Sequence, residues 1–273
     1  MTSDIHNTAI VSPRAELGAG VKIGPYAVIG DDVEIGADTS IGPHTVIEPF
    51  TRIGARNRIS AHTIIGGAPQ DLTYDGSQTW LEIGDDNIVR ELVTLNRSTN
   101  SERPTTIGSH CFFMAASHVG HDCQVGDHVV LTNGVLIGGH VEIGDHVNMG
   151  GAAVVHQFCR IGKLAMVRGT TPVNKDVLPF CMVAGDPVTH YRLNSIGLRR
   201  AGINGERYRA LERAFRDLRA GGDLGNVPDT EETAYMRDWL AAESRRGLHG
   251  FVRGKEIDTR SDKSNSGRSR PHA

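Results

Sequence analysis

Residues 23–47 read IGPYAVIGDDVEIGADTSIGPHTVI, and every sixth residue in this stretch is isoleucine. The spacing extends in both directions and returns in register after each of two interruptions. Internal repetition of this kind is the signature of a fold built from stacked units. The repeated apolar positions are Ile5, Val11, Leu17, Ile23, Ile29, Ile35, Ile41, Ile47, Ile53, Ile59, Ile65, Ile83, Val89, Leu95, Ile107, Phe113, Val119, Val125, Leu131, Ile137, Ile143, Met149, Val155, Ile161, Val167 and Val173.

Each six-residue unit is predicted to be a short strand followed by a turn. Two residues before the apolar position the chain places a small or β-branched residue, as at Ala27, Thr39 and Thr45. Alternation along a strand points both side chains to the same side. One strand cannot bury its own face, so the units are predicted to wrap into coils that stack as parallel strands around an apolar interior.

Composition agrees with stacked turns. The 273 residues include 33 glycines and only 5% aromatic residues, which favours such turns over a sandwich or a helical bundle. Residues 190–273 carry 17 Lys/Arg against 12 Asp/Glu, which leaves 12 against 20 for the rest. This basic segment predicts either a surface for an acidic partner or an ordinary solvated face. Without a hydrophobic run of signal-peptide or membrane-spanning length, we expect a soluble, cytoplasmic chain.

The cysteines are predicted to be structural. Cys111, Cys123 and Cys159 fall at the small interior position, where a thiol behaves as a compact hydrophobe. Cys181 lies outside the register. A CxxC pair is absent from the sequence, so neither a disulfide framework nor a thiolate zinc site is indicated.

Residues 18 apart lie on one edge if three units make a coil, and the outward positions then sort into three faces. The charged, solvent face reads Glu16, Glu34, Arg52, Gln124, Glu142 and Arg160. The apolar face reads Val28, Val46, Ile64, His118, Leu136 and Val154. The mixed face reads Lys22, Arg58, Phe112, Val130 and Met166. An exposed apolar stripe predicts an oligomer interface. The interruptions 66–80 and 96–104 are predicted loops expelled from the coil, where function concentrates.

The candidate site is the stretch Ala116–Asp122, which reads ASHVGHD. Counting by 18 places Gly139 over His121 and His140 over Asp122, with Gln157 on the next coil. An imidazole beside a carboxylate suits a general base near neutral pH. The other spaced histidines are predicted to be exposed ladders without chemistry: His110, His128 and His146, and His44 with His62.

At this point the motifs resemble those of a known family. His-x-x-His-Asp-Cys over 118–123, Pro-Gln-Asp over 69–71, Val-His-Gln-Phe over 155–158 and Gly-Leu-Arg-Arg over 197–200 resemble the acyl-[acyl carrier protein]–UDP-N-acetylglucosamine O-acyltransferases. The resemblance implies a left-handed parallel β-helix over 1–187, a small helical domain over 188–253, and a homotrimer. Residues 254–273 are predicted to be a disordered tail.

The resemblance also implies a reaction. A 3-hydroxyacyl group would pass from acyl carrier protein to the 3-hydroxyl of UDP-N-acetylglucosamine, the first step of lipid A biosynthesis, without cofactor or metal. His121 would be the general base, Asp122 would orient it, and the Gly139 N–H would stabilise the oxyanion. The implied residues for the sugar nucleotide are Gln70, Asp71, His118, His140, His156, Gln157, Asn194 and Arg200. Met114, Met166 and Gly169 would line the acyl channel, with Gly169 favouring a longer chain.

Four positions depart from the family pattern. Thr73 replaces a usual lysine, Pro187 replaces an often polar residue, Arg168 replaces the first glycine of a pair, and Ser98 stands where glycine is common. A relative that uses another UDP-sugar, such as one with a 3-amino group, is therefore an alternative. Two further alternatives are a metal-dependent enzyme similar to the γ-carbonic anhydrases and a non-catalytic scaffold.

The C-terminal part is predicted to contain two capping helices. The first would begin after Asn204 and end near 221–222, and the second would begin after Thr230 and stop at Gly247. In the family reading, the arginines of this part dock the acidic carrier protein: Arg200, Arg207, Arg209, Arg213, Arg216 and Arg219.

Overall fold

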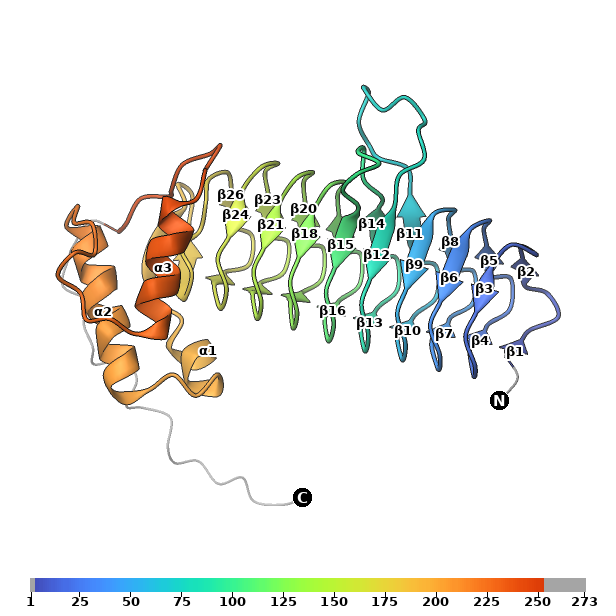
Figure 1. Ribbon diagram of the computed structural model, residues 1–273, viewed down its shortest axis with the longest axis horizontal. Helices are drawn as coiled ribbons and strands as arrows, with labels where there is room; N and C mark the ends of the chain where they lie inside the picture. Colours follow the sequence, from blue (N-terminus) through green and yellow to red (C-terminus); the bar gives the residue numbers. More distant parts are fainter. Residues whose placement is uncertain (1–2, 253–273) are drawn as a thin grey trace, which may run out of the picture.

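The computed structural model describes residues 3–252. These residues form an elongated stack of β-coils whose C-terminal end is covered by helices (Figure 1). This architecture confirms the predicted hexapeptide-repeat parallel β-helix. The predicted disordered tail, 254–273, lies outside the described residues.

The described strands form three sheets, here called A, B and C, and successive strands from β1 to β26 enter the three sheets in turn. Sheet A contains β1 (Asp4–Ile5), β4 (Lys22–Ile23), β7 (Ser40–Ile41), β10 (Arg58–Ile59), β13 (Ile88–Val89), β16 (Phe112–Phe113), β19 (Val130–Leu131), β22 (Asn148–Met149), β25 (Met166–Val167), β27 (Cys181–Ala184) and the antiparallel β28 (Thr189–Leu193).

Sheet B contains β2 (Ile10–Val11), β5 (Val28–Ile29), β8 (Val46–Ile47), β11 (Ile64–Gly67), β14 (Thr94–Asn96), β17 (His118–Val119), β20 (Leu136–Ile137), β23 (Val154–Val155) and β26 (Pro172–Val173). Sheet C contains β3 (Glu16–Leu17), β6 (Val33–Ile35), β9 (Thr51–Ile53), β12 (Leu81–Ile83), β15 (Thr105–Ile107), β18 (Gln124–Val125), β21 (Glu142–Ile143) and β24 (Arg160–Ile161). The turns that join these sheets are the A–B, B–C and C–A corners.

The strand register shows how the two interruptions are accommodated. Val46 pairs with Ile64, 18 residues on, but Ile64 pairs with Thr94 and Thr94 with His118, which are 30 and 24 residues on. The extra residues leave the stack at two successive B–C corners, between β11 and β12 and between β14 and β15. Gly67 and Asn96 still belong to strands, so the loops themselves span 68–80 and 97–104. The domain boundary at 187 stays a prediction, and sheet A continues to β28 beyond it.

The predicted interior positions form the core, with one exception. From Ile23 onward, each repeated apolar side chain is buried. In the first coil Ile5 is 43% exposed, and Val11 and Leu17 are half-buried. The reason is that this coil has no neighbour on its N-terminal side within the described residues. All four cysteines are buried, and burial raises the pKa of the Cys111, Cys123 and Cys159 thiols to about 12.

Corner geometry places one residue per hexad in the left-handed backbone region. Asp, Asn and His are enriched there because a short polar side chain tolerates positive φ. Asp122, His128 and His140 all sit at such positions, with φ of 60°, 57° and 59°. The sequence period therefore dictates the backbone conformation of several candidate site residues.

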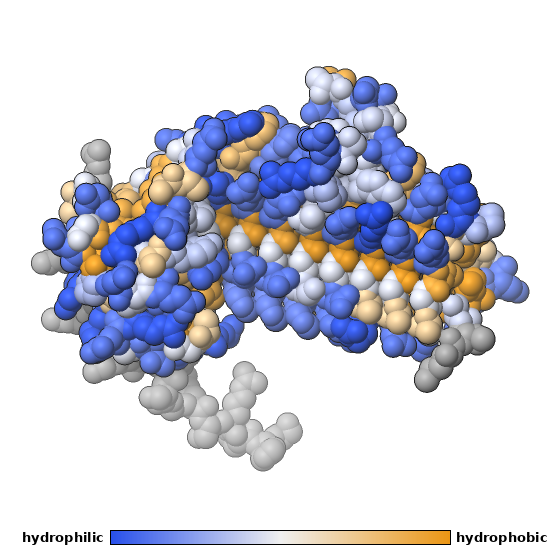
Figure 2. Space-filling model, in the orientation of Figure 1, coloured by the Kyte–Doolittle hydropathy of each residue, from blue (hydrophilic) through white to orange (hydrophobic). Residues whose placement is uncertain are grey.

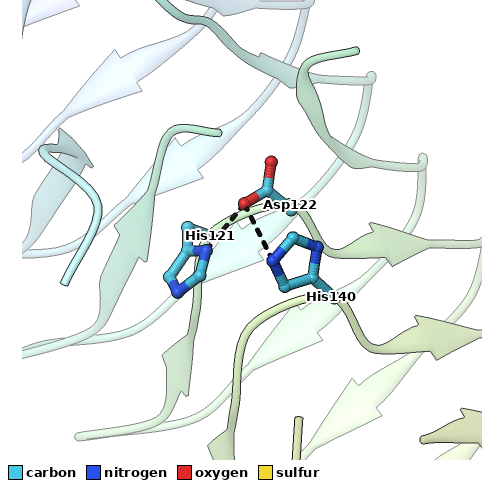
Figure 3. A group of neighbouring side chains, drawn as sticks. All are labelled: His121, Asp122 and His140. Carbon is cyan, nitrogen blue, oxygen red and sulfur yellow. Dashed lines mark hydrogen bonds and ion pairs between the residues drawn. The ribbon is translucent and has the colours of Figure 1, made fainter. Parts of the chain in front are cut away.

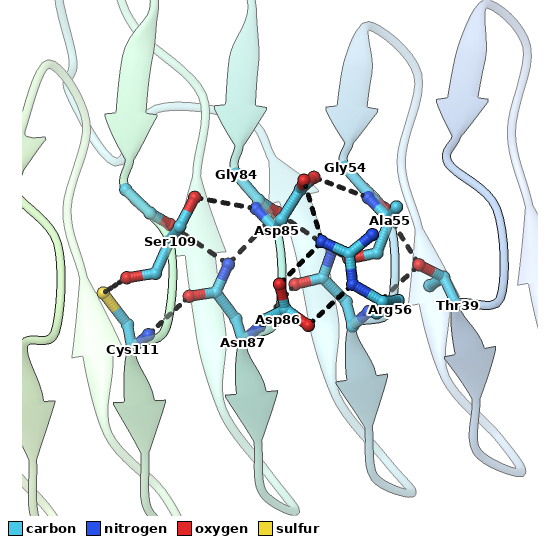
Figure 4. Close-up of polar contacts among 12 residues, drawn as sticks. Thr39, Gly54, Ala55, Arg56, Gly84, Asp85, Asp86, Asn87, Ser109 and Cys111 are labelled. Atoms are coloured by element: carbon cyan, nitrogen blue, oxygen red, sulfur yellow. Dashed lines mark hydrogen bonds and ion pairs between the residues drawn. The ribbon is translucent and has the colours of Figure 1, made fainter.

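Polar ladders hold the C–A corner together (Figure 4). The side chain of Asn87 accepts a hydrogen bond from the Cys111 N–H at 2.7 Å and donates to the Gly84 and Gly108 carbonyls at 3.1 Å each. Arg56 pairs with Asp86 at 2.7 Å and with Asp85 at 3.2 Å. These contacts join successive coils, so the corner is structural.

The outer faces agree with the predicted sorting. Sheet C presents rows of hydrophilic side chains, and hydrophobic residues show there as a narrow band that runs along the stack, across the strands (Figure 2). Sheet B presents the apolar stripe, in which Ile64, Leu136 and Val154 are 43%, 47% and 38% exposed. This stripe is therefore available for an interface.

The C-terminal helices are α1 (Ser195–Arg200), α2 (Gly205–Arg219) and α3 (Glu231–Ala241). Thr230 caps α3 with a complete capping box, as predicted. Asn204 precedes α2, but its side chain makes no capping hydrogen bond, and α3 ends at Ala241, before the predicted stop at Gly247. Within the described residues, every helix is too short or too polar to cross a membrane.

Candidate active site

The candidate site lies at the B–C corner, where both loops leave the stack. The turn after β17 carries His121 and Asp122, the turn after β20 carries Gly139 and His140, and the turn after β23 carries Gln157 and Phe158. The amide of His140 donates to the His121 carbonyl at 2.9 Å, and that of Phe158 donates to the Gly139 carbonyl at 3.1 Å. The corner residues therefore stack as the spacing of 18 predicts.

His121 and Asp122 form a hydrogen-bonded pair (Figure 3). Nδ1 of His121 lies 2.7 Å from Oδ2 of Asp122, and each side chain is only 9% exposed. The second ring nitrogen, Nε2, points away from the carboxylate. A carboxylate on Nδ1 fixes the imidazole so that Nε2 accepts a proton, which is the arrangement of a general base and its orienter.

Gly139 provides the space beside this imidazole. A Cβ built on Gly139 would lie 2.5 Å from Cε1 and 2.6 Å from Nε2 of His121. Any other residue would push the ring from its place. Among residues 3–252, the Gly139 N–H donates to no backbone carbonyl.

His140 lies against the same carboxylate. Its Nε2 is 3.5 Å from Oδ2 of Asp122, its ring meets His121 edge-on at 87°, and it stacks on Phe158 at 4.5 Å. Burial lowers the pKa of His140, although Asp122 opposes this effect. The neutral ring therefore prevails at pH 7, where it is able to donate or accept a hydrogen bond.

A groove of about 400 Å³ runs past His121 along the outer face of sheet B. Five other predicted site residues line it: Gln70, His118, Gly139, His156 and Gln157. Nδ1 of His118 lies 2.8 Å from the Thr94 hydroxyl. The pKa of His118 is lowered, mainly by burial and to a smaller extent by the charge of His121. The exposed apolar residues Leu136 and Val154 also line the groove, so its lining combines polar and apolar side chains.

Three further residues at this corner were not predicted. The Thr99 hydroxyl donates to Oδ2 of Asp122 at 2.8 Å, and the Thr105 hydroxyl accepts from the Asp122 N–H at 2.8 Å. Arg246 donates to the Gln157 carbonyl at 2.8 Å. Thr105 has an interior-position signal in the repeat, but the sequence offers no signal that loop residue Thr99 or C-terminal Arg246 returns to this place.

Several predicted residues lie elsewhere in the chain. Met166, Asn194 and Arg200 line a separate groove of about 580 Å³ beside sheet A and α1. Asn194 is buried there, accepting from the Gly197 N–H at 3.1 Å and donating to the Leu164 carbonyl at 2.9 Å. Met114 and Gly169 lie at the A–B corner, after β16 and β25. Within one chain, the structure does not bring these five residues to His121, and their roles stay predictions.

Thr73 binds the carboxylate of Asp71 within the same loop. Its N–H and hydroxyl both donate to Oδ1 of Asp71 at 2.8 Å. Hydrogen bonding from Thr73 lowers the pKa of Asp71. Asp71 is therefore ionised and held locally by Thr73.

The donor atoms of His121, Asp122 and His140 all lie within 4.8 Å of one another, so these residues have the composition of a small metal site. The shortest contact among them is nevertheless the 2.7 Å hydrogen bond between an imidazole and a carboxylate. This geometry suits proton transfer.

Comparison with known proteins shows the family of the chain. Residues 176–249 match the family described as Udp N-acetylglucosamine O-acyltransferase, Domain 2, and 14–49, 32–67 and 104–139 match the bacterial transferase hexapeptide (six repeats). The acyl-[acyl-carrier-protein]–UDP-N-acetylglucosamine O-acyltransferase of Herminiimonas arsenicoxydans is 45% identical over 88% of this chain and 90% of its own. The enzyme of the same name from Thiobacillus denitrificans is 46% identical over 89% and 98%.

Solved structures give the same result. LpxA from Acinetobacter baumannii superposes with a TM-score of 0.85 at 38% identity, covering 90% of this chain and 99% of that one. UDP-N-acetylglucosamine O-acyltransferase (LpxA) from Moraxella catarrhalis gives 0.80 at 38% identity, covering 89% and 98%. The chain belongs to the acyl-[acyl-carrier-protein]–UDP-N-acetylglucosamine O-acyltransferase family.

Proposed function

We propose that this protein transfers a 3-hydroxyacyl group from acyl carrier protein to the 3-hydroxyl of UDP-N-acetylglucosamine, with His121 as general base. The observation that carries the proposal is the His121–Asp122 pair, which opens onto a groove while Nε2 remains directed away from the carboxylate. The family relationship supplies the substrates, and the site supplies the chemistry.

The chemistry follows from the positions of the groups. Nε2 of His121 takes the proton of the attacking sugar hydroxyl, and Asp122 stabilises the imidazolium that forms. The oxygen attacks the thioester carbonyl, and the pantetheine thiol leaves with the proton from His121. The Gly139 N–H, adjacent to the ring, is the donor for the oxyanion, and such a donor contributes roughly 3–4 kcal/mol in related sites.

Binding of the acceptor is assigned to the groove. Gln70, His118, His140, His156 and Gln157 supply amide and imidazole groups for sugar hydroxyls and phosphate oxygens. A single chain leaves Asn194 and Arg200 at another face, so they serve the site only if a second copy presents them. The apolar stripe of sheet B is the surface for that copy, and a homotrimer is the assembly that we propose.

Helix α2 of this chain carries a basic surface that would suit the acidic carrier protein. Arg209, Arg213, Arg216 and Arg219 project from α2 into solvent, whereas Arg207 is occupied by Glu232. We assign this surface to carrier-protein docking, in keeping with the soluble, cytoplasmic setting expected from the sequence.

A second acceptor is favoured by one observation. Thr73 replaces the lysine of the family and holds Asp71 as a local carboxylate. A carboxylate without that cation suits a UDP-sugar whose 3-position carries an amino group. The product would then be an amide in place of an ester.

The decisive experiment incubates the purified protein with 3-hydroxyacyl carrier proteins of several chain lengths and with either UDP-N-acetylglucosamine or its 3-amino analogue. O-acylated UDP-N-acetylglucosamine is the expected product, and the preferred chain length reports on Gly169. Turnover of the amino sugar alone would move the assignment to the second acceptor. No acyl transfer together with stoichiometric zinc in the purified protein would favour the metal-dependent alternative, and no acyl transfer with any donor and no bound metal would favour a scaffold.

A further inference from the structure

We propose that Thr99 is a positioning residue for acyl transfer, which holds the Asp122 carboxylate in line with His121 from the loop 97–104. The inference rests on the proposed function because it assigns a role within the His121–Asp122 pair. It also assigns a role to the loop 97–104, which is the second interruption of the repeat.

Thr99 donates two hydrogen bonds to the Asp122 carboxylate, one to each oxygen. The Thr99 N–H donates to Oδ1 of Asp122 at 3.0 Å, and the Thr99 hydroxyl donates to Oδ2 at 2.8 Å. Oδ2 also meets Nδ1 of His121 at 2.7 Å. Two donors on the two oxygens fix both the position and the plane of the carboxylate, and therefore fix the direction of the bond to His121.

Asp122 requires such partners because of where it lies. Its side chain is 9% exposed, and the neighbouring ring nitrogen of His140 is 3.5 Å away, too far for a strong hydrogen bond. A buried carboxylate without donors loses its hydration and becomes easier to protonate. Here burial raises the pKa of Asp122, but hydrogen bonds from His121 and Thr99 outweigh it, and the net pKa is lowered.

The loop is built to present Thr99. Thr94 pairs with His118, so one coil before Asp122 the chain would form the same corner turn, but instead it leaves the stack after Asn96. Ser98 is buried, its N–H donates to the Trp80 carbonyl at 3.2 Å, and its hydroxyl donates to the Asn100 carbonyl at 2.8 Å. When the chain rejoins at β15, Thr105 accepts the Asp122 N–H. Both ends of the loop therefore contact Asp122.

The test compares Thr99→Val, Thr99→Ser and Thr106→Val in acyl transfer. Valine keeps the shape and the N–H contact but removes the hydroxyl, whereas serine restores it. We expect kcat to fall roughly tenfold in Thr99→Val, the size of one charge-assisted hydrogen bond, with KM for both substrates within about twofold. Thr99→Ser should return most of kcat. Thr106 bonds Gln124 on sheet C at 2.9 Å, so Thr106→Val controls for loss of a hydroxyl elsewhere.

A double-mutant cycle shows whether Thr99 acts through Asp122. In an Asp122→Asn background, Thr99→Val should change kcat less than twofold, because the carboxylate that the Thr99 hydroxyl positions is already absent. A full tenfold loss in that background, a Thr99→Val enzyme with wild-type kcat, or equal losses in Thr99→Val and Thr106→Val would each overturn the proposal. If Thr99→Val does not fold, Thr99→Ala removes the same hydroxyl with less demand on packing. Failure of the proposed function is separate: it would appear as an active His121→Ala variant, whatever Thr99 does.

Discussion

Two corners of this β-helix are made from the same residue types, yet they have different consequences. At the C–A corner His110, His128 and His146 stack in parallel at 4.9 and 4.5 Å, beside an aspartate ladder in which Asp127 accepts from the Ser109 N–H and Asp145 from the Asp127 N–H. At the B–C corner the imidazole of His121 bonds a carboxylate side chain and faces a groove.

The difference lies in how the polar groups are used. At the C–A corner Asp127 and Asp145 each accept a backbone N–H of the coil before, so their carboxylates join coils. At the B–C corner the expelled loops replace the regular turns, and Thr99 and Gln70 arrive in their place. An interrupted repeat, and not histidine content, distinguishes the candidate site from a structural corner.

The largest expected effect comes from closing the space beside His121. In Gly139→Ala the new methyl would stand 2.6 Å from Nε2, and the ring must leave its position. Because general-base catalysis contributes roughly 100- to 10,000-fold, we expect kcat to fall about a thousandfold. The melting temperature should change little, since the ring is a movable neighbour. Gly151→Ala is the control: its Cβ would meet its nearest atom at 3.5 Å, and near wild-type turnover is expected. Equal activity in both variants would show that turnover does not depend on the position of the His121 ring.

The next largest effect is a loss of stability at low pH. It sets the pH range in which variants of the two corners are compared. His190 lies in neither corner: its Nε2 accepts the Leu178 N–H at 2.9 Å, and its Nδ1 faces the His249 carbonyl at 2.9 Å. Burial lowers the pKa of His190 to about 4. The unfolded chain thus binds the proton first, so stability is complete above the unfolded pKa of about 6.5 and is lost as pH falls toward 4.

A shift of this size corresponds to roughly 3 kcal/mol for His190, at about 1.4 kcal/mol for each pH unit. Urea melts should show a decrease of about 2 kcal/mol in the free energy of unfolding between pH 7.5 and pH 5, because pH 5 lies about 1.5 units below the unfolded pKa. His190→Asn should be less stable at pH 7.5, and its stability should fall less between the two pH values. A wild-type protein as stable at pH 5 as at pH 7.5 would contradict the neutral, buried state of His190. Activity of corner variants should accordingly be compared above pH 7.

The smallest effect is expected from matched substitutions at two left-handed positions. His128 and His140 have φ of 57° and 59°, and asparagine tolerates this backbone. His128→Asn should keep kcat and KM within about twofold, whereas His140→Asn should raise KM for the nucleotide sugar about tenfold through lost hydrogen bonding. Steady-state kinetics on both variants decide it: a KM change as large in His128→Asn would place function at the C–A corner as well.

Much of this fold was predictable because a period of six is a strong constraint. Repetition dictates which side chains face inward, and a spacing of 18 brought Gly139 to His121 and His140 to Asp122 before any coordinates. The exposed Ile5 shows the limit at the end of the stack, where the pattern continues but the neighbouring coil does not.

Residues outside the repeat were not predictable in the same way. Thr99 reaches Asp122 through a loop whose path depends on contacts with Trp80 and Asn100, and no period encodes those contacts. Arg246 returns to Gln157 across 89 residues. Asn194 and Arg200 match the family motif in sequence but line another groove of the same chain. In the homotrimer that we propose, a neighbouring copy would bring them to His121.

The central claim is that the imidazole of His121 performs the proton transfer. Its most direct test is kcat for His121→Ala at saturating UDP-N-acetylglucosamine and hydroxyacyl carrier protein, with the melting temperature measured on the same sample. The account predicts a loss of at least about a hundredfold with an unchanged melting temperature. A folded His121→Ala protein that turns over within threefold of wild type would contradict it.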